Sequence, residues 1–225
     1  MDQDRALRQR RQPSQPTAIP DRYEIAGAWC RLCLVALPLV VLSGCQAALP
    51  YQAAPASTYA SEPFPVRLVN RDRFDPSMRP AHVPNTTGAA AGTIVVDTSA
   101  KHLYLVESKD SAMRYGIAVG KSGYGWKGTA TVGRMAKWPP WYPTDDMKQT
   151  TPGLPDRIAP GAQNPLGARA LYLYKDGRDT YYRIHGTSEP WTIGTEASSG
   201  CIRMFNEDVI ALYDKVSPGA KVIVR

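Results

Sequence analysis

The sequence has few of the residues from which metal, redox and phosphate sites are built. It contains three histidines and four cysteines in 225 residues. It has no HExxH pattern, no carboxylate–histidine cluster with metal-ligand spacing and no glycine-rich phosphate loop. Cys30-x-x-Cys33 lies inside an apolar N-terminal segment, which is no place for a metal or redox site. We therefore expect a domain that works without a metal ion or a cofactor.

Long hydrophobic runs are also scarce. The main one, LCLVALPLVVL at 32–42, is too short to span a bilayer comfortably and is interrupted by Pro38. Six arginines precede this run, and a basic lead-in followed by a short apolar core is typical of a signal peptide. The pattern therefore favours export over a transmembrane anchor.

The apolar run ends in LSGC, from Leu42 to Cys45, which resembles a bacterial lipobox. The resemblance implies a signal peptide over 1–44, cleavage before Cys45 and lipidation of that cysteine. Under the enterobacterial sorting rule, Gln46 directs such an anchor to the outer membrane. A chance match to an ordinary cleavage site is the alternative. We expect a periplasmic, lipid-anchored protein, in the outer membrane rather than the inner one.

Basic residues exceed acidic ones, with a net charge of +7. Removing residues 1–44 takes away six arginines and four acids, which leaves 21 − 16 = +5. The basic run RQRRQ at 8–12 lies in the leader, and no basic run interleaved with aromatics follows it. Nucleic acid is therefore not an expected partner, whereas a modestly cationic domain suits an anionic polymer.

Composition divides the chain into three parts. After the leader, residues 45–91 are rich in alanine and proline without periodicity, which predicts a tether. From residue 92 onward, short β-branched and aromatic runs at 93–97, 102–107 and 112–120 predict strands. Residues 171–185 predict a hairpin with its turn at Asp176-Gly177. The run 221–225 predicts a last strand.

One helix is predicted late in the chain, capped by Asn206 and ended by Pro218-Gly219. The prolines of 137–147 predict a semi-rigid loop over the sheet. Residues 92–225 should therefore form one mainly β domain, a sandwich or barrel with one or two short helices.

Cys201 is the one thiol left if Cys45 is lipidated and the leader is removed. No internal disulfide is then possible, and a lone thiol in an oxidising compartment suggests a reactive one. A cysteine nucleophile needs a nearby base. His82 lies in the tether and His102 opens an early strand, so His185, at a strand end sixteen positions before Cys201 (201 − 185), is the candidate.

The residues around Cys201 fit acyl transfer. Gly200 permits backbone shapes that are barred to other residues, so the N–H groups of Ser199, Gly200 and Cys201 can converge on one point. Such a nest stabilises the oxyanion of a tetrahedral intermediate. A plain turn is the alternative, because glycine before cysteine is common in turns.

The stretch HGTSEPWTIGTEASSGCIRM at 185–204 resembles the signature of L,D-transpeptidases with the YkuD-type catalytic domain. The ErfK/YbiS-like branch is the most similar, since serine often stands there at the place of Ser199. NPLGARALYL at 164–173 also resembles this domain. The similarity extends over about residues 93–224.

The resemblance implies a YkuD-type β fold and a peptidoglycan L,D-transpeptidase. By position, Cys201 is the nucleophile and His185 the general base. Cys201 would attack the bond between diaminopimelate at stem position three and D-Ala at position four. The acyl group would pass to a second stem, giving a 3→3 cross-link, or to a lysine of an outer-membrane protein.

Two other functions stay open. The same site could pass the acyl group to water, as an L,D-carboxypeptidase, or the chain could be a non-catalytic peptidoglycan-binding lipoprotein. Arg203 matches the Arg/Asn position of the motif and would either pair with a substrate carboxylate or hold the loop by an ion pair. Ser198, Gly186 and Thr187 would shape the pocket. The upstream Thr-Pro-x-Gly run of the family is altered here, as GTATVGRMAKW at 128–138.

Overall fold

The computed structural model describes residues 54–122 and 125–225. These residues belong to one compact unit, Gln46–Arg225. The signal peptide expected over 1–44 and the lipidation expected at Cys45 lie outside the described residues. Within the described ranges, no helix is long and apolar enough to cross a membrane.

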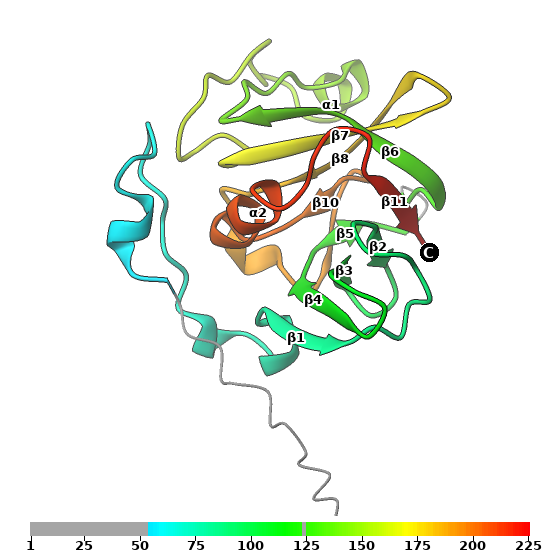
Figure 1. Cartoon of the computed structure of the whole chain (residues 1–225). Helices are drawn as coiled ribbons and strands as arrows, with labels where there is room; N and C mark the ends of the chain where they lie inside the picture. Colours follow the sequence, from blue (N-terminus) through cyan, green and yellow to red (C-terminus); the bar gives the residue numbers. More distant parts are fainter. Residues whose placement is uncertain (1–53, 123–124) are drawn as a thin grey trace, which may run out of the picture. The chain divides into compact units, whose positions relative to one another are not determined.

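The main sheet has nine strands, in the order β1-β4-β3-β2-β11-β6-β7-β8-β10 (Figure 1). In its first half, β2, β3 and β4 form an antiparallel meander, and β1 pairs with β4 at the edge of the sheet. Its second half is antiparallel from β11 through β8 and ends with the short parallel strand β10. A separate pair of short strands, β5 and β9, is parallel. The strands are β1 Ala81–Pro84, β2 Ile94–Asp97, β3 His102–Val106, β4 Ser111–Gly116, β5 Val119–Gly120, β6 Gly128–Lys137, β7 Arg169–Lys175, β8 Arg178–His185, β9 Glu196–Ser198, β10 Ile202–Arg203 and β11 Lys221–Val224.

The last strand joins the two halves of the sheet. β11 pairs in parallel with β2 and antiparallel with β6. Its alternating burial puts Val222 and Val224 inside. The chain end therefore closes a core that contains residues of both halves and of helix α2, Asn206–Tyr213. Members of this core include Ile94, Leu103, Val132, Leu171, Ile184, Ile202 and Leu212.

The mainly β fold class is confirmed, with two short α-helices, α1 Asp145–Thr150 and α2, among the described residues. The β7–β8 hairpin turns at Asp176 and Gly177, as predicted, and their φ angles of 51° and 75° are those of a type I′ turn, which favours Asp-Gly. The helix prediction is wrong in one detail. Phe205 occupies the N-cap position without a side-chain cap, and the Asn206 side chain bonds elsewhere.

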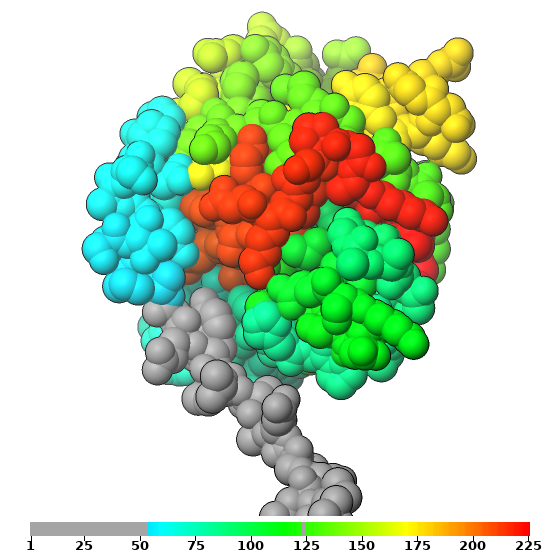
Figure 2. Space-filling model, in the orientation of Figure 1, coloured from blue at the N-terminus to red at the C-terminus, as the bar shows by residue number. Residues whose placement is uncertain are grey.

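The expectation of a loose tether does not hold for residues 54–91. Three 3-10 turns, η1 Ala56–Tyr59, η2 Arg71–Arg73 and η3 Pro76–Met78, precede β1. We call residues 54–80 the N-terminal strap. It lies against the domain beside α2 (Figure 2). The tether was predicted from alanine and proline content. Composition does not reveal the buried long-range ion pairs that hold this segment against the domain.

Two residues, Arg71 and Glu62, anchor the strap through ion pairs with the rest of the domain. Arg71, in the strap, donates to both carboxylate oxygens of Asp208 at 3.0 and 2.8 Å, and all of these groups are buried. Its guanidinium also lies 3.9 Å from the centre of the Phe205 ring. At the second point, Glu62 of the strap pairs with the buried Arg169 of β7. Because an unpaired charge is costly to bury, each partner depends on the other.

The segment 137–147 forms an irregular connection, as its prolines predicted. Trp138 is buried with φ of 44°, and its indole N–H donates to Glu62 at 2.7 Å. Trp141 pairs with Ile158 in an isolated bridge, and helix α1 follows, capped by the Thr144 side chain. Trp138 is therefore a packing residue under the strap.

Candidate active site

His185 is the last residue of β8, where the strand reaches the interior of the domain. It pairs with Ala170 of β7 on one side and with Arg203 of β10 on the other. Only 4% of its surface is exposed. Strand pairing on both sides therefore fixes the position of the His185 backbone, from which the imidazole projects.

The parallel register of β8 and β10 brings the candidate base and nucleophile onto neighbouring strands. Ile184 lies opposite Ile202, and both side chains point into the core. Because side chains alternate along a strand, His185 and Arg203 point away from that core. Cys201 directly precedes Ile202, so it begins on the same side as these two residues.

The His185 ring is held in one tautomer. Its Nδ1 lies 2.5 Å from the Gly186 carbonyl oxygen, which only accepts hydrogen bonds, so Nδ1 carries the proton in the neutral ring. Burial lowers the pKa of His185 to about 4, against the opposing effect of this hydrogen bond. The charges of Arg203 and Arg183 lower the pKa further. At neutral pH the ring is uncharged, with a basic electron pair on Nε2.

The Cys201 thiol is half-buried and contacts β8. Its Sγ donates to the Tyr181 carbonyl oxygen at 3.8 Å. Burial raises the pKa of the Cys201 thiol above its ordinary value, while the Arg183 main-chain N–H and the Arg183 and Arg203 charges oppose that rise. These shifts favour a neutral thiol and a neutral imidazole at rest over a thiolate–imidazolium ion pair.

A bulge in β8 carries the carbonyl that contacts the thiol. Opposite Tyr172 and Tyr174 of β7, two positions apart, β8 places Arg183 and Asp179, four positions apart. Within the extra residues, Tyr181 has φ of 61°, a conformation that is rare for a non-glycine residue. Its side chain is 77% exposed. Bulges of this kind re-aim groups next to active sites.

Arg183 was not among the residues singled out from sequence. It lies two positions before His185, and the two-residue period of a strand would have placed it on the same face. Its guanidinium bonds both carboxylate oxygens of Asp179 at 3.0 and 3.1 Å. The same guanidinium acts on the pKa values of both His185 and Cys201. It is therefore part of the electrostatic setting of the site.

Arg203 is the second cation of this setting. Its guanidinium donates to Glu189 Oε2 at 2.7 Å and to Thr192 Oγ1 at 3.5 Å. Both partners lie in the connection between His185 and Cys201, which includes the turn η4, Pro190–Thr192. Of the two roles considered for Arg203, holding the loop by an ion pair is the one that this contact supports.

Ser198 closes the loop around the candidate nucleophile. Its hydroxyl donates to the Cys201 carbonyl oxygen at 2.5 Å and accepts from the Gly200 N–H at 3.1 Å. The Gly200 N–H is thus engaged inside the loop, which leaves the N–H groups of Ser199 and Cys201 as donors for an oxyanion. The Ser199 side chain is exposed.

Two glycines permit the close packing of this loop. Gly200 has a φ angle of 121°, a backbone conformation that residues other than glycine rarely adopt. Below it, Gly120 of β5 pairs with Ser198, and a Cβ atom on Gly120 would lie 2.8 Å from the Gly200 Cα. The strand pair β5–β9 therefore supports the nucleophile loop from beneath.

Asn206 holds the other side of the site. Its Oδ1 accepts from the N–H groups of Ala168 at 2.9 Å and Thr187 at 3.3 Å, and its Nδ2 donates to the Thr187 carbonyl at 2.9 Å. A Cβ atom on Gly186 would lie 2.2 Å from Asn206 Oδ1, so glycine is required there. Gly186 and Thr187 thus position His185 through their backbone.

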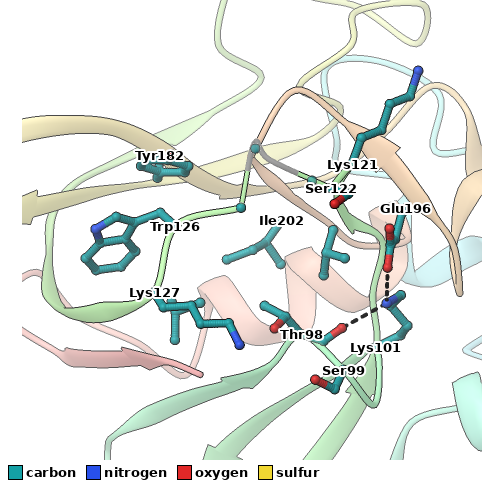
Figure 3. Close-up of a pocket in the computed structure, with 15 residues that line it drawn as sticks. Thr98, Ser99, Lys101, Lys121, Ser122, Trp126, Lys127, Tyr182, Glu196 and Ile202 are labelled. Atoms are coloured by element: carbon teal, nitrogen blue, oxygen red, sulfur yellow. Dashed lines mark hydrogen bonds and ion pairs between the residues drawn. The ribbon is translucent and has the colours of Figure 1, made fainter.

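A cavity of about 360 Å³ lies beside the nucleophile loop (Figure 3). Gly200 and Ile202, which flank Cys201, form part of its wall. The other lining residues include Thr98, Lys101, Val119, Lys121, Trp126, Lys127, Tyr182, Glu196 and Val224. In the described part of the chain, no group of three histidine, cysteine or acidic residues is arranged to hold a metal ion.

Comparison with known proteins gives consistent matches. The family model of the L,D-transpeptidase catalytic domain, YkuD, matches residues 91–224. The probable L,D-transpeptidase ErfK/SrfK of Escherichia coli is 33% identical over 57% of this chain and 42% of its own length. This chain therefore spans less than half of that relative. A putative L,D-transpeptidase of Fuscovulum blasticum is 31% identical over 68% of this chain and 74% of its own.

A solved structure from Brucella melitensis is also similar. It is described as a probable carnitine operon oxidoreductase, caia, and is 49% identical to this chain. It covers 66% of this chain and 94% of its own, with a TM-score of 0.47.

Proposed function

Because this chain belongs to the L,D-transpeptidase catalytic-domain family (YkuD), we propose that it is a cysteine acyltransferase acting on peptidoglycan stem peptides. In this proposal Cys201 is the nucleophile and His185 is the general base. The substrate is a tetrapeptide stem, cut between diaminopimelate and the terminal D-Ala.

The pairing of β8 with β10 is the observation that carries this proposal. It brings His185, at the end of β8, next to β10, which Cys201 directly precedes, on the face opposite the buried pair Ile184 and Ile202. The Gly186 carbonyl supports the base role because it keeps the proton on Nδ1 and leaves Nε2 unprotonated.

The reaction would begin when the thiol leaves the Tyr181 carbonyl and turns to His185 Nε2. As Nε2 takes the proton, Cys201 Sγ attacks the carbonyl carbon of diaminopimelate. The N–H groups of Ser199 and Cys201 would stabilise the resulting oxyanion. The imidazolium then gives its proton to the leaving amine, D-Ala departs, and a thioester remains on Cys201.

The second half would reverse these proton transfers. His185 takes a proton from the acceptor amine, the amine attacks the thioester, and the Cys201 sulfur leaves and recovers the proton. With a second stem as the acceptor, the product is a 3→3 cross-link. A lysine of an outer-membrane protein would give a covalent protein anchor, and water would give a tripeptide.

A purified protein tests the reaction class. Incubated with diaminopimelate-containing disaccharide tetrapeptide, the protein should release D-Ala and form 3→3 dimers, both detected by mass spectrometry. Tripeptide without dimer would favour the carboxypeptidase. Stem binding without any turnover would favour the non-catalytic lipoprotein and contradict the proposal.

We also propose that the domain works in the periplasm, held by a lipid on Cys45 in the outer membrane. The support is the LSGC sequence directly after the apolar run. Fractionation tests it: Cys45→Ala should move the protein from the membrane fraction to the soluble periplasmic fraction. Continued membrane retention would contradict lipidation at this cysteine.

A further inference from the structure

We propose that the cavity beside the nucleophile loop is a carboxylate-binding subsite, with Lys127 as the residue that selects anionic stem peptides. The ligand class is a peptide arm that carries a free carboxylate. This inference rests on the proposed function, since a stem peptide must be the substrate for the subsite to matter in turnover.

The position of the cavity links it to the reacting atoms. Gly200 and Ile202 lie in its wall and are the chain neighbours of Cys201. Tyr182 also lines it, between Tyr181, whose carbonyl accepts from the thiol, and Arg183, whose N–H faces the sulfur. The cavity therefore borders the chain neighbours of Cys201 on one segment and a neighbour of the sulfur's contacts on the other, although neither Cys201 nor His185 lines it.

The charge of the lining is positive. Three lysines and one glutamate contribute 3 − 1 = +2. Lys101 is already paired, because its Nζ donates to Glu196 Oε1 at 3.1 Å and to the Thr98 carbonyl at 3.0 Å. Among the residues that the structure describes, Lys121 and Lys127 have no acidic partner. Two ammonium groups thus remain for an anion.

The two unpaired lysines differ in direction. Figure 3 shows Lys127 extending along the cavity toward Thr98, whereas Lys121 points away from it. Lys127 therefore offers its ammonium group to a ligand inside the cavity without a change of rotamer. Lys121 contributes to the field at the rim.

The rest of the lining is partly apolar and suits the hydrocarbon part of a peptide. The rings of Trp126 and Tyr182 pack with centroids 5.7 Å apart. Ile202, Val119 and Val224 continue this surface. A volume of about 360 Å³ is within the roughly 300–1,000 Å³ of ligand pockets. An apolar wall with a few polar groups opposite is the usual form of a small-molecule site.

Stem peptides carry the matching chemistry. Their γ-linked glutamate and their diaminopimelate each keep a free carboxylate, next to methylene groups. Both the donor stem and the acceptor stem have these groups, so the shared chemistry does not distinguish the two. Donor-dependent D-Ala release and acceptor-dependent dimer formation do distinguish them, when each is measured against its own concentration.

The test compares Lys127→Gln with Lys109→Gln in the full chain, since Lys109 is exposed in a turn and lines no cavity. Lys127→Gln should raise KM for D-Ala release about tenfold while kcat changes little, because a hydrogen bond to a charged group is lost. Lys109→Gln should leave both constants unchanged. If only the KM for the acceptor stem in dimer formation rises, the subsite belongs to the acceptor stem.

A second substrate identifies the charge that is recognised. With stem carboxylates amidated, wild type should bind more weakly, and Lys127→Gln should cause no further loss, as in a double-mutant cycle. An equal loss on charged and amidated stems, or no loss on either, would overturn the subsite.

Failure of the subsite and failure of the proposed function remain distinguishable. In a Cys201→Ala background, calorimetry measures binding of the intact tetrapeptide without turnover. If Lys127→Gln weakens this binding about tenfold while wild type never releases D-Ala, the subsite stands and the proposed function fails. If wild type releases D-Ala but Lys127→Gln leaves the affinity for tetrapeptide unchanged, the proposed function stands and the subsite fails.

Discussion

The hydroxyl of Ser198 is bonded to the nucleophile's own backbone, since it donates to the Cys201 carbonyl oxygen at 2.5 Å. The Ser198 hydroxyl oxygen in turn accepts from the Gly200 N–H at 3.1 Å. One buried side chain thus closes the loop that carries Cys201. The direction of the Cys201 N–H, and with it the oxyanion site, depends on this closure.

Ser198→Ala should therefore lower kcat for D-Ala release roughly tenfold with little change in KM, because one hydrogen bond that shapes the loop is lost. Steady-state kinetics on the tetrapeptide measures both constants. Ser199→Ala is the matched control, since the neighbouring serine is exposed and should tolerate the change. Equal effects of the two substitutions would contradict the role given to Ser198.

The pH dependence of thiol reactivity follows from the raised pKa of Cys201. A raised pKa keeps the thiol protonated at neutral pH, so alkylation by iodoacetamide should be slow there. The rate should rise with pH beyond the range in which free cysteine titrates. Intact-mass measurement of the alkylated fraction, with glutathione in parallel, gives the two profiles. A rate that already reaches its plateau below about pH 7 would indicate a thiolate–imidazolium pair instead.

The contribution of His185 to domain stability should become unfavourable between about pH 6.5 and pH 4. The pKa of His185 is about 4 in the folded state. Between this value and the ordinary pKa of histidine, the unfolded chain therefore binds a proton at this residue and the folded chain does not. This group therefore destabilises the folded state increasingly as the pH falls through this window. At about pH 5 the loss from this group is about 2 kcal/mol.

Denaturant unfolding of wild type and His185→Gln at about pH 7 and pH 5 measures this contribution, since glutamine does not titrate. The variant should lose less stability than wild type over this interval. Identical pH dependence of the two proteins would show that His185 is not buried in its neutral form.

The strap should contribute directly to folding stability through Arg71. Arg71→Ala leaves the carboxylate of Asp208 buried without its partner, which costs about 3 kcal/mol. Arg73→Ala is the matched control in the same 3-10 turn, because Arg73 is exposed and its loss should fall within about 0.5 kcal/mol. Chemical unfolding compares the two. Equal stabilities would mean that the strap is not anchored through Arg71.

Short-range patterns in the sequence predicted much of the fold. The Asp176-Gly177 turn, the β-branched runs and the final strand are local features, and each lies where it was expected. β6 was missed, because glycine, alanine and polar residues weaken the strand pattern over 128–137. The pairing of β8 with β10 depends on contacts across the sheet, which no local pattern specifies.

The surroundings of the site were harder to predict than its two central residues. Asn206 was predicted to cap the helix because of its residue type, but its amide bridges Ala168 and Thr187. The packing of the strap could not be predicted for a similar reason. Nothing near Arg71 in the sequence indicates that its partner is Asp208, 137 positions away. Side chains that act over such separations become visible only in the folded structure.

The central claim is acyl transfer through Cys201, with His185 as base, and intact-mass spectrometry of the protein mixed with tetrapeptide tests it most directly. Wild type should gain the mass of the stem less D-Ala, mapped by digestion to Cys201. His185→Gln should form this adduct far more slowly, and Cys201→Ala should form none. Undiminished D-Ala release by Cys201→Ala, or turnover in wild type through an adduct on another residue, would contradict the account.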